Sequence, residues 1–142
     1  MPEAVAGRGL IDTSVLIDLE RISHEELPQE LAIAAVTLAE LAAGPHATTD
    51  PTERARRQER LQRAEATFDP IVFDASAARA YGRLYAAVTS SGRKARGRRA
   101  VDLLIAATAL AAQLPLYTRN PPDFEGLGGL VDVTVVRLKQ DA

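Results

Sequence analysis

The sequence contains no cysteine, only two histidines and no long apolar run. Without cysteine the protein cannot form a disulfide scaffold, a thiolate zinc site or a cysteine nucleophile. His24 and His46 do not have a metal-binding spacing, which argues against a multi-histidine metal centre. No apolar stretch approaches the roughly 20 residues that a membrane span needs. Because the first residues also lack the basic start and apolar stretch of a signal peptide, we expect a cytoplasmic protein that does not contact a membrane.

The overall composition is that of an ordinary folded domain. Of 142 residues, 46% are hydrophobic and 25% are charged, which argues against wholesale disorder. This length suits one hydrophobic core, and no repeat or linker interrupts the chain. We therefore expect residues 1–142 to form a single domain.

The net charge of −2 conceals an uneven distribution along the chain. Residues 1–50 carry −7, residues 51–99 carry +7 and residues 100–142 carry −2. A strongly basic segment inside a nearly neutral chain is a feature of nucleic-acid-binding proteins.

Two parts of the basic segment differ in pattern. Between residues 53 and 65 glutamates alternate with arginines, as on a solvated helix face, whereas residues 93–99 contain five basic residues and no acid. We therefore select Arg93, Lys94 and Arg96 as candidates for contacts with nucleic-acid phosphates. The alternative is that these side chains face water or pair with acidic residues of this chain or of a partner.

Short apolar runs alternate with segments of helical periodicity. Strands are predicted at residues 9–11, 31–36, 71–73, 116–118 and 131–136, and helices at 13–19, 37–43, 51–67, 75–89 and 101–114. This alternation predicts an α/β fold with a mostly parallel central sheet that helices cover on both faces.

Acidic residues follow the strands at the edge of such a sheet where ligands bind. Asp12 follows the first strand, Glu40 follows the second, and Asp123 follows the strand that ends at Thr118. Each has a structural alternative. Asp12 suits a helix N-cap, Glu40 has the spacing of a capping box with Thr37, and Asp123 suits a turn.

Asp102 is expected near the start of the helix over 101–114, where the helix dipole favours an acid. It shares a helix face with Ile105, Ala106 and Ala109, so the carboxylate points toward the core and needs a partner. Several carboxylates at one sheet edge repel one another unless a cation lies between them. Oxygen ligands without histidine or cysteine favour Mg²⁺ or Mn²⁺. No glycine-rich phosphate loop follows the first strand, which argues against a nucleotide-binding fold.

Four segments carry these acids in a characteristic order. They are GLIDTSVLI at residues 9–17, TLAEL at 37–41, DLLIAATA at 102–109 and TRNPPDF at 118–124. Together they resemble the motifs of PIN-domain ribonucleases, and more narrowly of the VapC-type toxins of bacterial type II toxin–antitoxin systems. The resemblance runs from about residue 8 to the C-terminus. It implies a PIN-like fold and an Mg²⁺-dependent endoribonuclease, with Mn²⁺ as a possible substitute, that hydrolyses RNA phosphodiester bonds.

The resemblance also implies a role for each acid. Asp12, Glu40 and Asp102 are expected to hold the ion, and a fourth acid is expected from the last loop. Relatives carry that acid either where this chain has Asn120 or three residues later, at Asp123. Which of the two positions completes the site stays open.

Further expectations concern the surroundings of the site and the partners. The residues expected to support the acids through hydroxyl or amide groups are Thr13, Ser14, Thr118 and Asn120. The resemblance implies an RNA substrate, a cognate VapB-type antitoxin, a homodimer and a larger toxin–antitoxin complex. Two other functions are compatible with the residues: a metal-dependent phosphatase acting on small esters, and a non-catalytic module that binds RNA or a partner.

Overall fold

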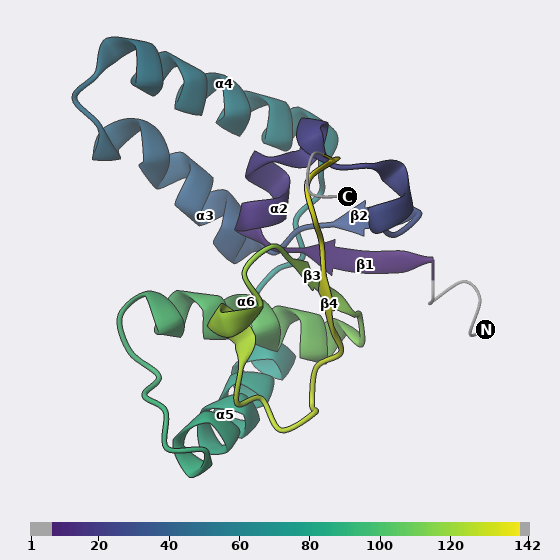
Figure 1. The fold of residues 1–142 in the computed structure, drawn as a ribbon. Helices are drawn as coiled ribbons and strands as arrows, with labels where there is room; N and C mark the ends of the chain where they lie inside the picture. The colour runs from purple at the N-terminus through teal and green to yellow at the C-terminus, as the bar shows by residue number, and fades with distance from the viewer. Residues whose placement is uncertain (1–6, 140–142) are drawn as a thin grey trace.

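The computed structural model of the chain describes residues 7–139. At its centre lies a four-stranded sheet in the order β2-β1-β3-β4, and every neighbouring pair of strands is parallel (Figure 1). The strands are β1 (Arg8–Ile11), β2 (Glu30–Ala32), β3 (Leu116–Thr118) and β4 (Val133–Val135). All the strands therefore end at the same edge of the sheet.

Helices cover both faces of this sheet. Among the described residues the α-helices are α2 (Thr13–Ile17), α3 (Ala35–Ala43), α4 (Pro51–Thr67), α5 (Ala75–Ser90) and α6 (Arg98–Ala112). The short 3-10 helices are η1 (Leu19–Arg21), η2 (His24–Glu26), η3 (Gly44–Ala47) and η4 (Pro121–Phe124). In Figure 1, α5 and α6 lie on one side of the strands, and α2, α3 and α4 lie on the other. The predicted α/β class and the parallel sheet are confirmed. None of the helices in this part of the chain has the length and apolar character needed to traverse a bilayer.

The alternation of side chains along β1 divides the core into two clusters. Leu10 points toward α5 and α6, where it joins a buried cluster that includes Leu103. The next residue, Ile11, points the opposite way and packs with Val15 of α2 and Leu41 of α3. The strand is buried on both faces, which explains why it reads as a short continuous apolar run.

The ends of the helices follow from local chemistry. Asp50 and Asp74 cap α4 and α5 by accepting hydrogen bonds from the backbone N–H groups of Glu53 and Ala77. The C-cap of helix α6 is Gln113, which has a left-handed conformation (φ 58°) and lies two residues before a proline.

Several predicted boundaries differ from the structure, and three differences have identifiable reasons. The strand expected at 71–73 is reduced to a single bridge between Ile71 and Ala34, and Val72 is 64% exposed. Strand β2 ends at Ala32, earlier than expected, because Ala34 is already the N-cap of α3. Helix α6 begins at Arg98 rather than at residue 101, after a glycine with positive φ. The helices expected at 51–67 and 75–89 agree with α4 and α5 within one residue.

Candidate active site

Asp12 joins the end of β1 to the start of α2 and is 5% exposed. One carboxylate oxygen, Oδ1, accepts hydrogen bonds from Ser14 Oγ at 2.6 Å and from the Val15 N–H at 3.0 Å. The other, Oδ2, accepts one from Thr118 Oγ1 at 2.5 Å. Asp12 is therefore an N-cap, as its structural alternative predicted, but two carboxylate oxygens offer about four lone pairs, so the cap does not exhaust its acceptors.

The hydroxyl groups of Ser14 and Thr118, which donate to Asp12, are themselves fixed by the loop after β3. The N–H of Arg119 donates to Ser14 Oγ at 3.1 Å, and the N–H of Asn120 donates to Thr118 Oγ1 at 2.9 Å. Because each hydroxyl accepts from this loop and donates to Asp12, the carboxylate is fixed relative to both β1 and β3.

Arg119 contributes a second link, which the sequence analysis did not identify. Its Nη1 donates to Asp18 Oδ2 at 2.5 Å, so the loop after β3 is tied to the C-cap of α2. The two residues are 101 positions apart, and no local pattern indicates the pair.

Glu40 lies in the second half of α3, and Thr13 Oγ1 donates to its Oε1 at 2.5 Å. Thr13 Oγ1 also lies 3.2 Å from Thr37 Oγ1, which is fully buried. The capping-box interpretation of Glu40 is wrong, because α3 begins at Ala35 and Thr37 lies inside the helix. Glu40 is therefore free of a helix-capping role.

Asp102 is the most perturbed carboxyl group of the site. Asp102 is the fifth residue of α6, beyond the first turn, and is 9% exposed. Within residues 7–139 no group donates a hydrogen bond to its carboxylate. Burial, followed by the negative charges of nearby acids, raises the pKa of Asp102 from 3.8 to about 7, while Arg98 opposes the rise. The acids are Asp123, Glu40 and Asp12. A buried carboxyl facing other acids is typical of a functional site.

Burial also raises the pKa of Asp12, although its hydrogen bonds from Ser14, Thr118 and Val15 act in the opposite direction. The charge of Asp123 contributes to this rise as well. The negative charge of Asp123, a half-buried residue of η4, therefore acts on both Asp12 and Asp102. Asp123 lies within electrostatic reach of these two acids.

These residues meet in one small pocket at the carboxyl ends of the strands. From the residues selected in the sequence, the pocket is lined by Asp12, Thr13, Ser14, Glu40, Asp102, Asn120 and Asp123. Thr118 does not line it but reaches it through Asp12. The pocket also includes Ile105 and Arg98. Arg98 was not selected, although its position four residues before Asp102 on one helix face was a usable signal.

Most basic residues of the run at 93–99 lie outside the pocket that the acids share. Arg93 Nη2 pairs with Glu125 Oε1 at 3.1 Å, and Arg99 donates to backbone carbonyls of residues 122, 123 and 125. Arg99 holds η4 against the start of α6, and Arg93 links the loop before α6 to Glu125, directly after η4. Lys94 and Arg96 are exposed and do not line the pocket.

The donor set of the pocket suits a hard divalent cation, but it is not a closed cage. Within residues 7–139 no three acidic side chains lie close enough together to form a complete ligand cluster. The pocket has room for about one water-sized group. Mg²⁺ commonly binds through one or two carboxylates and keeps several waters, so the open arrangement fits Mg²⁺ better than an ion that needs an all-protein cage.

Comparison with known proteins agrees with this geometry. Residues 9–127 match the family model described as PIN domain. The chain belongs to the PIN-domain family. The matched segment contains all four acids of the pocket, strands β2 and β3, and all of β1 except its first residue.

Among PIN-domain proteins, the chain is similar to ribonucleases of the VapC type. It is 35% identical to Ribonuclease VapC5 of Mycobacterium tuberculosis, with 92% of this chain and 95% of that protein covered. It is 36% identical to Ribonuclease VapC8 of the same species, over 77% of this chain and 96% of that protein. The crystal structure of VapBC-5, a toxin–antitoxin system of M. tuberculosis, includes a chain that superimposes with a TM-score of 0.79 at 35% identity, covering 93% of this chain and 99% of that one. The resemblance recognised in the sequence is confirmed.

Proposed function

We propose that this protein is an Mg²⁺-dependent endoribonuclease that acts as a toxin and is neutralised by a cognate VapB-type antitoxin. The observation that carries the proposal is the convergence of four carboxylates, from three helix–strand units far apart in sequence, on one small pocket at the carboxyl ends of a parallel sheet. The similarity to proteins named ribonucleases supports RNA as the substrate.

Each acid has a proposed task that its surroundings support. Asp12 and Asp102 hold the ion, because Asp12 is fixed by hydroxyl groups while Asp102 has no hydrogen-bond donor in the described part of the chain. Glu40 Oε1 is engaged by Thr13, which leaves Oε2 to orient the attacking water and accept its proton. Asp123 completes the acidic ring, and Asn120 lines the same wall.

Bound Mg²⁺ supplies Lewis-acid chemistry: it neutralises phosphate charge and acidifies water. The protein supplies the geometry. Ser14 and Thr118 prevent Asp12 from rotating away, and Ile105 contributes an apolar wall. Among the described residues, Arg98 is the one cation that lines the pocket, and its guanidinium can contact a phosphate oxygen of the substrate.

The partner assignment follows the solved structures of relatives. VapBC-5 is described as a member of the VapBC toxin–antitoxin family, and a further match is a toxin–antitoxin complex from Klebsiella pneumoniae at 27% identity and a TM-score of 0.61. We therefore infer a small antitoxin that binds this chain in a larger complex. The cytoplasmic location expected from the sequence stays a prediction.

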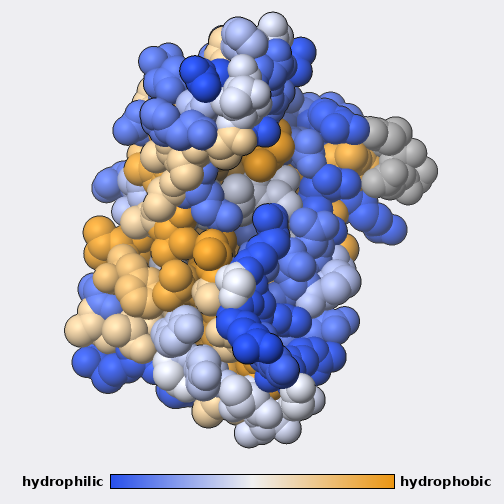
Figure 2. Space-filling model, turned by 90° about the vertical axis from the view of Figure 1, so that its left-hand side faces the viewer, coloured by the Kyte–Doolittle hydropathy of each residue, from blue (hydrophilic) through white to orange (hydrophobic). Residues whose placement is uncertain are grey.

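We also propose a homodimer formed through the face that carries α3. The side of the molecule where α3 and the start of α6 lie shows a broad apolar area in Figure 2. Helix α3 exposes Ala39, Ala42 and Ala43, which are spaced three and four residues apart along one stripe. Sedimentation of the purified protein tests this: an Ala39→Glu variant should become monomeric, and a parent that is already monomeric would contradict it.

The decisive test of the function is the sequencing of RNA ends after brief expression of the chain beside its Asp12→Asn variant. We expect new, recurrent ends with the parent chain and none with the variant. Assays on small phosphate esters separate the phosphatase alternative, because an endoribonuclease cuts RNA and leaves such esters intact. If the folded protein does not cleave RNA when Mg²⁺ is supplied, the result would favour the alternative of a non-catalytic module that binds RNA or a partner.

A further inference from the structure

A second cavity adjoins the acidic pocket and differs from it in charge. We call it the α3–α4 groove. Its charged lining residues are three arginines and two acids: Arg57, Arg60, Arg98, Glu40 and Glu53. Thr13, Glu40 and Arg98 line the acidic pocket as well, so the two spaces adjoin at the Thr13–Glu40 hydrogen bond. A ligand that enters the acidic pocket from this side passes the arginines.

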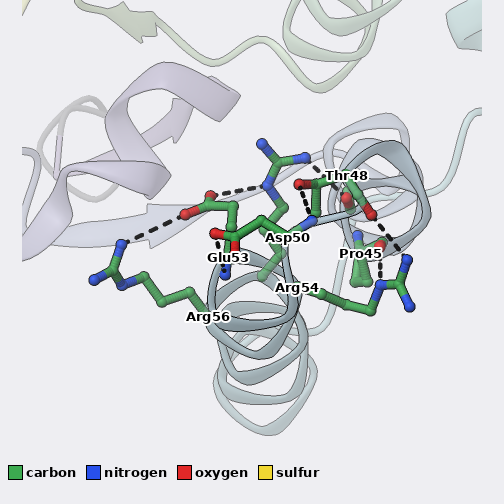
Figure 3. A network of polar contacts seen from close by, with 8 residues as sticks. Pro45, Thr48, Asp50, Glu53, Arg54 and Arg56 are labelled. Atoms are coloured by element: carbon green, nitrogen blue, oxygen red, sulfur yellow. Dashed lines mark hydrogen bonds and ion pairs between the residues drawn. The ribbon is translucent and has the colours of Figure 1, made fainter.

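The arginines of α4 are not equivalent, because most of them already have partners. Arg54 donates to the carbonyls of Pro45 and Thr48, and Arg56 pairs with Glu53 at 3.5 Å (Figure 3). The Arg54 contacts secure the turn between α3 and α4, whereas the Arg56–Glu53 pair lies within α4.

The remaining arginines of the helix separate into two groups. Arg57 donates to Glu53 Oε2 and to the Gly44 carbonyl, both at 2.9 Å, and Arg63 pairs with Glu59 and Glu20. Arg60 is different: within residues 7–139 it has neither a hydrogen bond nor an ion pair. Its half-buried side chain nevertheless lines the groove.

Arg98 has the same character at the other end of the groove. In the described part of the chain no acid lies within ion-pair distance of its guanidinium, and it borders both cavities. The groove therefore presents two uncommitted guanidinium groups, and the pocket beside it presents four carboxylates. Guanidinium groups bind phosphate through paired hydrogen bonds.

We propose that the RNA strand flanking the cleaved bond lies in the α3–α4 groove, with Arg60 and Arg98 contacting successive phosphates. This inference rests on the proposed ribonuclease function and adds the path of the substrate. The cleaved phosphate lies at the acidic pocket, where a cation offsets its charge, and the next phosphates lie where the protein itself supplies positive charge. Arg60 is thus a positioning residue, since it acts on the strand and not on the reacting atoms.

The test compares Arg60→Gln with Arg63→Gln. Both variants remove one charge from α4 and keep a good helix former. Both arginines line a neighbouring groove between α2 and α4, but only Arg60 also lines the α3–α4 groove. RNA binding is measured in Ca²⁺ across a salt series, and cleavage in Mg²⁺ is measured on a long RNA and on a dinucleotide. For Arg60→Gln we expect severalfold weaker RNA binding and a slope of log affinity against log salt that is smaller by about 0.7.

For the same variant, KM for long RNA should rise while kcat and dinucleotide cleavage stay at the parent's values. A defect in folding alone would instead lower the cleavage of the long RNA and of the dinucleotide together. The groove assignment would be overturned if the parent cuts RNA and the two variants, Arg60→Gln and Arg63→Gln, show the same RNA binding and cleavage. Unchanged RNA binding with weaker antitoxin binding would also overturn it and assign the groove to the protein partner. If the parent itself does not cut RNA, the proposed function fails instead.

Discussion

The hydroxyl of Thr118 donates a 2.5 Å hydrogen bond to Asp12 Oδ2 across 106 residues of sequence. The same hydroxyl accepts from the Asn120 N–H at 2.9 Å, and Thr118 is fully buried. One side chain at the end of β3 therefore fixes the orientation of the acid at the end of β1. The site is built across two neighbouring parallel strands, which is how segments remote in sequence come to share one pocket.

A Thr118→Val substitution tests this link. Valine keeps the volume but leaves the Asn120 N–H and one acceptor of Asp12 without a partner, so we expect a loss of about 1 to 3 kcal/mol in unfolding free energy. Metal affinity, measured by calorimetry, should also fall. Thr108→Val is the matched control, because that buried hydroxyl donates only to the Leu104 carbonyl within α6. Equal effects of the two variants on metal affinity would contradict the assigned role of Thr118.

The raised pKa of Asp102 predicts how stability depends on pH. Because its pKa is about 7 in the folded protein and near 3.8 when unperturbed, the folded state binds a proton more tightly than the unfolded state. Its contribution is thus fully present below about pH 4 and is lost as the pH rises through about 7.

An Asp102→Asn variant isolates this effect. Without metal and above pH 8 we expect the variant to be more stable than the parent by about 1 to 3 kcal/mol, and at pH 4 we expect the two to be nearly equal. Urea unfolding with a chelator present measures both. A parent that matches the variant at every pH would show that Asp102 is not held in a repulsive, buried environment.

Glu40→Gln separates catalysis from folding. Glutamine keeps an oxygen for Thr13, and no helix cap is lost, so the unfolding free energy should change by less than about 0.5 kcal/mol. If Glu40 takes a proton from the attacking water, RNA cleavage should fall by about a hundredfold. Glu65→Gln on α4 serves as the exposed control. Unchanged cleavage would leave Glu40 with a structural role only.

The basic run predicts a further, separable effect. Lys94 and Arg96 are exposed, whereas Arg93 is already paired with Glu125. If Lys94 and Arg96 contact RNA, replacing both with alanine should reduce the salt slope of binding by up to about 1.4. An unchanged slope, beside a reduced one for Arg60→Gln, would assign the strand to the groove alone.

Much of the fold was accessible from the sequence because it depends on local patterns. The apolar run before Asp12 and the periodicity of α4 and α5 report burial and helix formation directly. The grouping of Asp12, Glu40 and Asp102 was predictable once the strands were known to be parallel, because all the strands then end at one edge.

Other features depended on contacts between distant segments. The capping-box spacing at Thr37 is misleading because Thr37 is buried inside α3, where tertiary packing and not local hydrogen bonding decides its position. Ile71 has the composition of a strand, but it meets the sheet at a single bridge to Ala34. The freedom of Arg60 follows only from knowing which partners the other arginines of α4 have found.

The most direct test of the central claim is the rate of RNA cleavage by the purified protein against Mg²⁺ concentration, with Asp102→Asn measured in parallel. We predict no cleavage in chelator, restoration of cleavage by Mg²⁺ in the parent, and none at any Mg²⁺ concentration in the folded variant. Cleavage by the parent at an undiminished rate in chelator, or cleavage by Asp102→Asn at the parent's rate, would contradict the account.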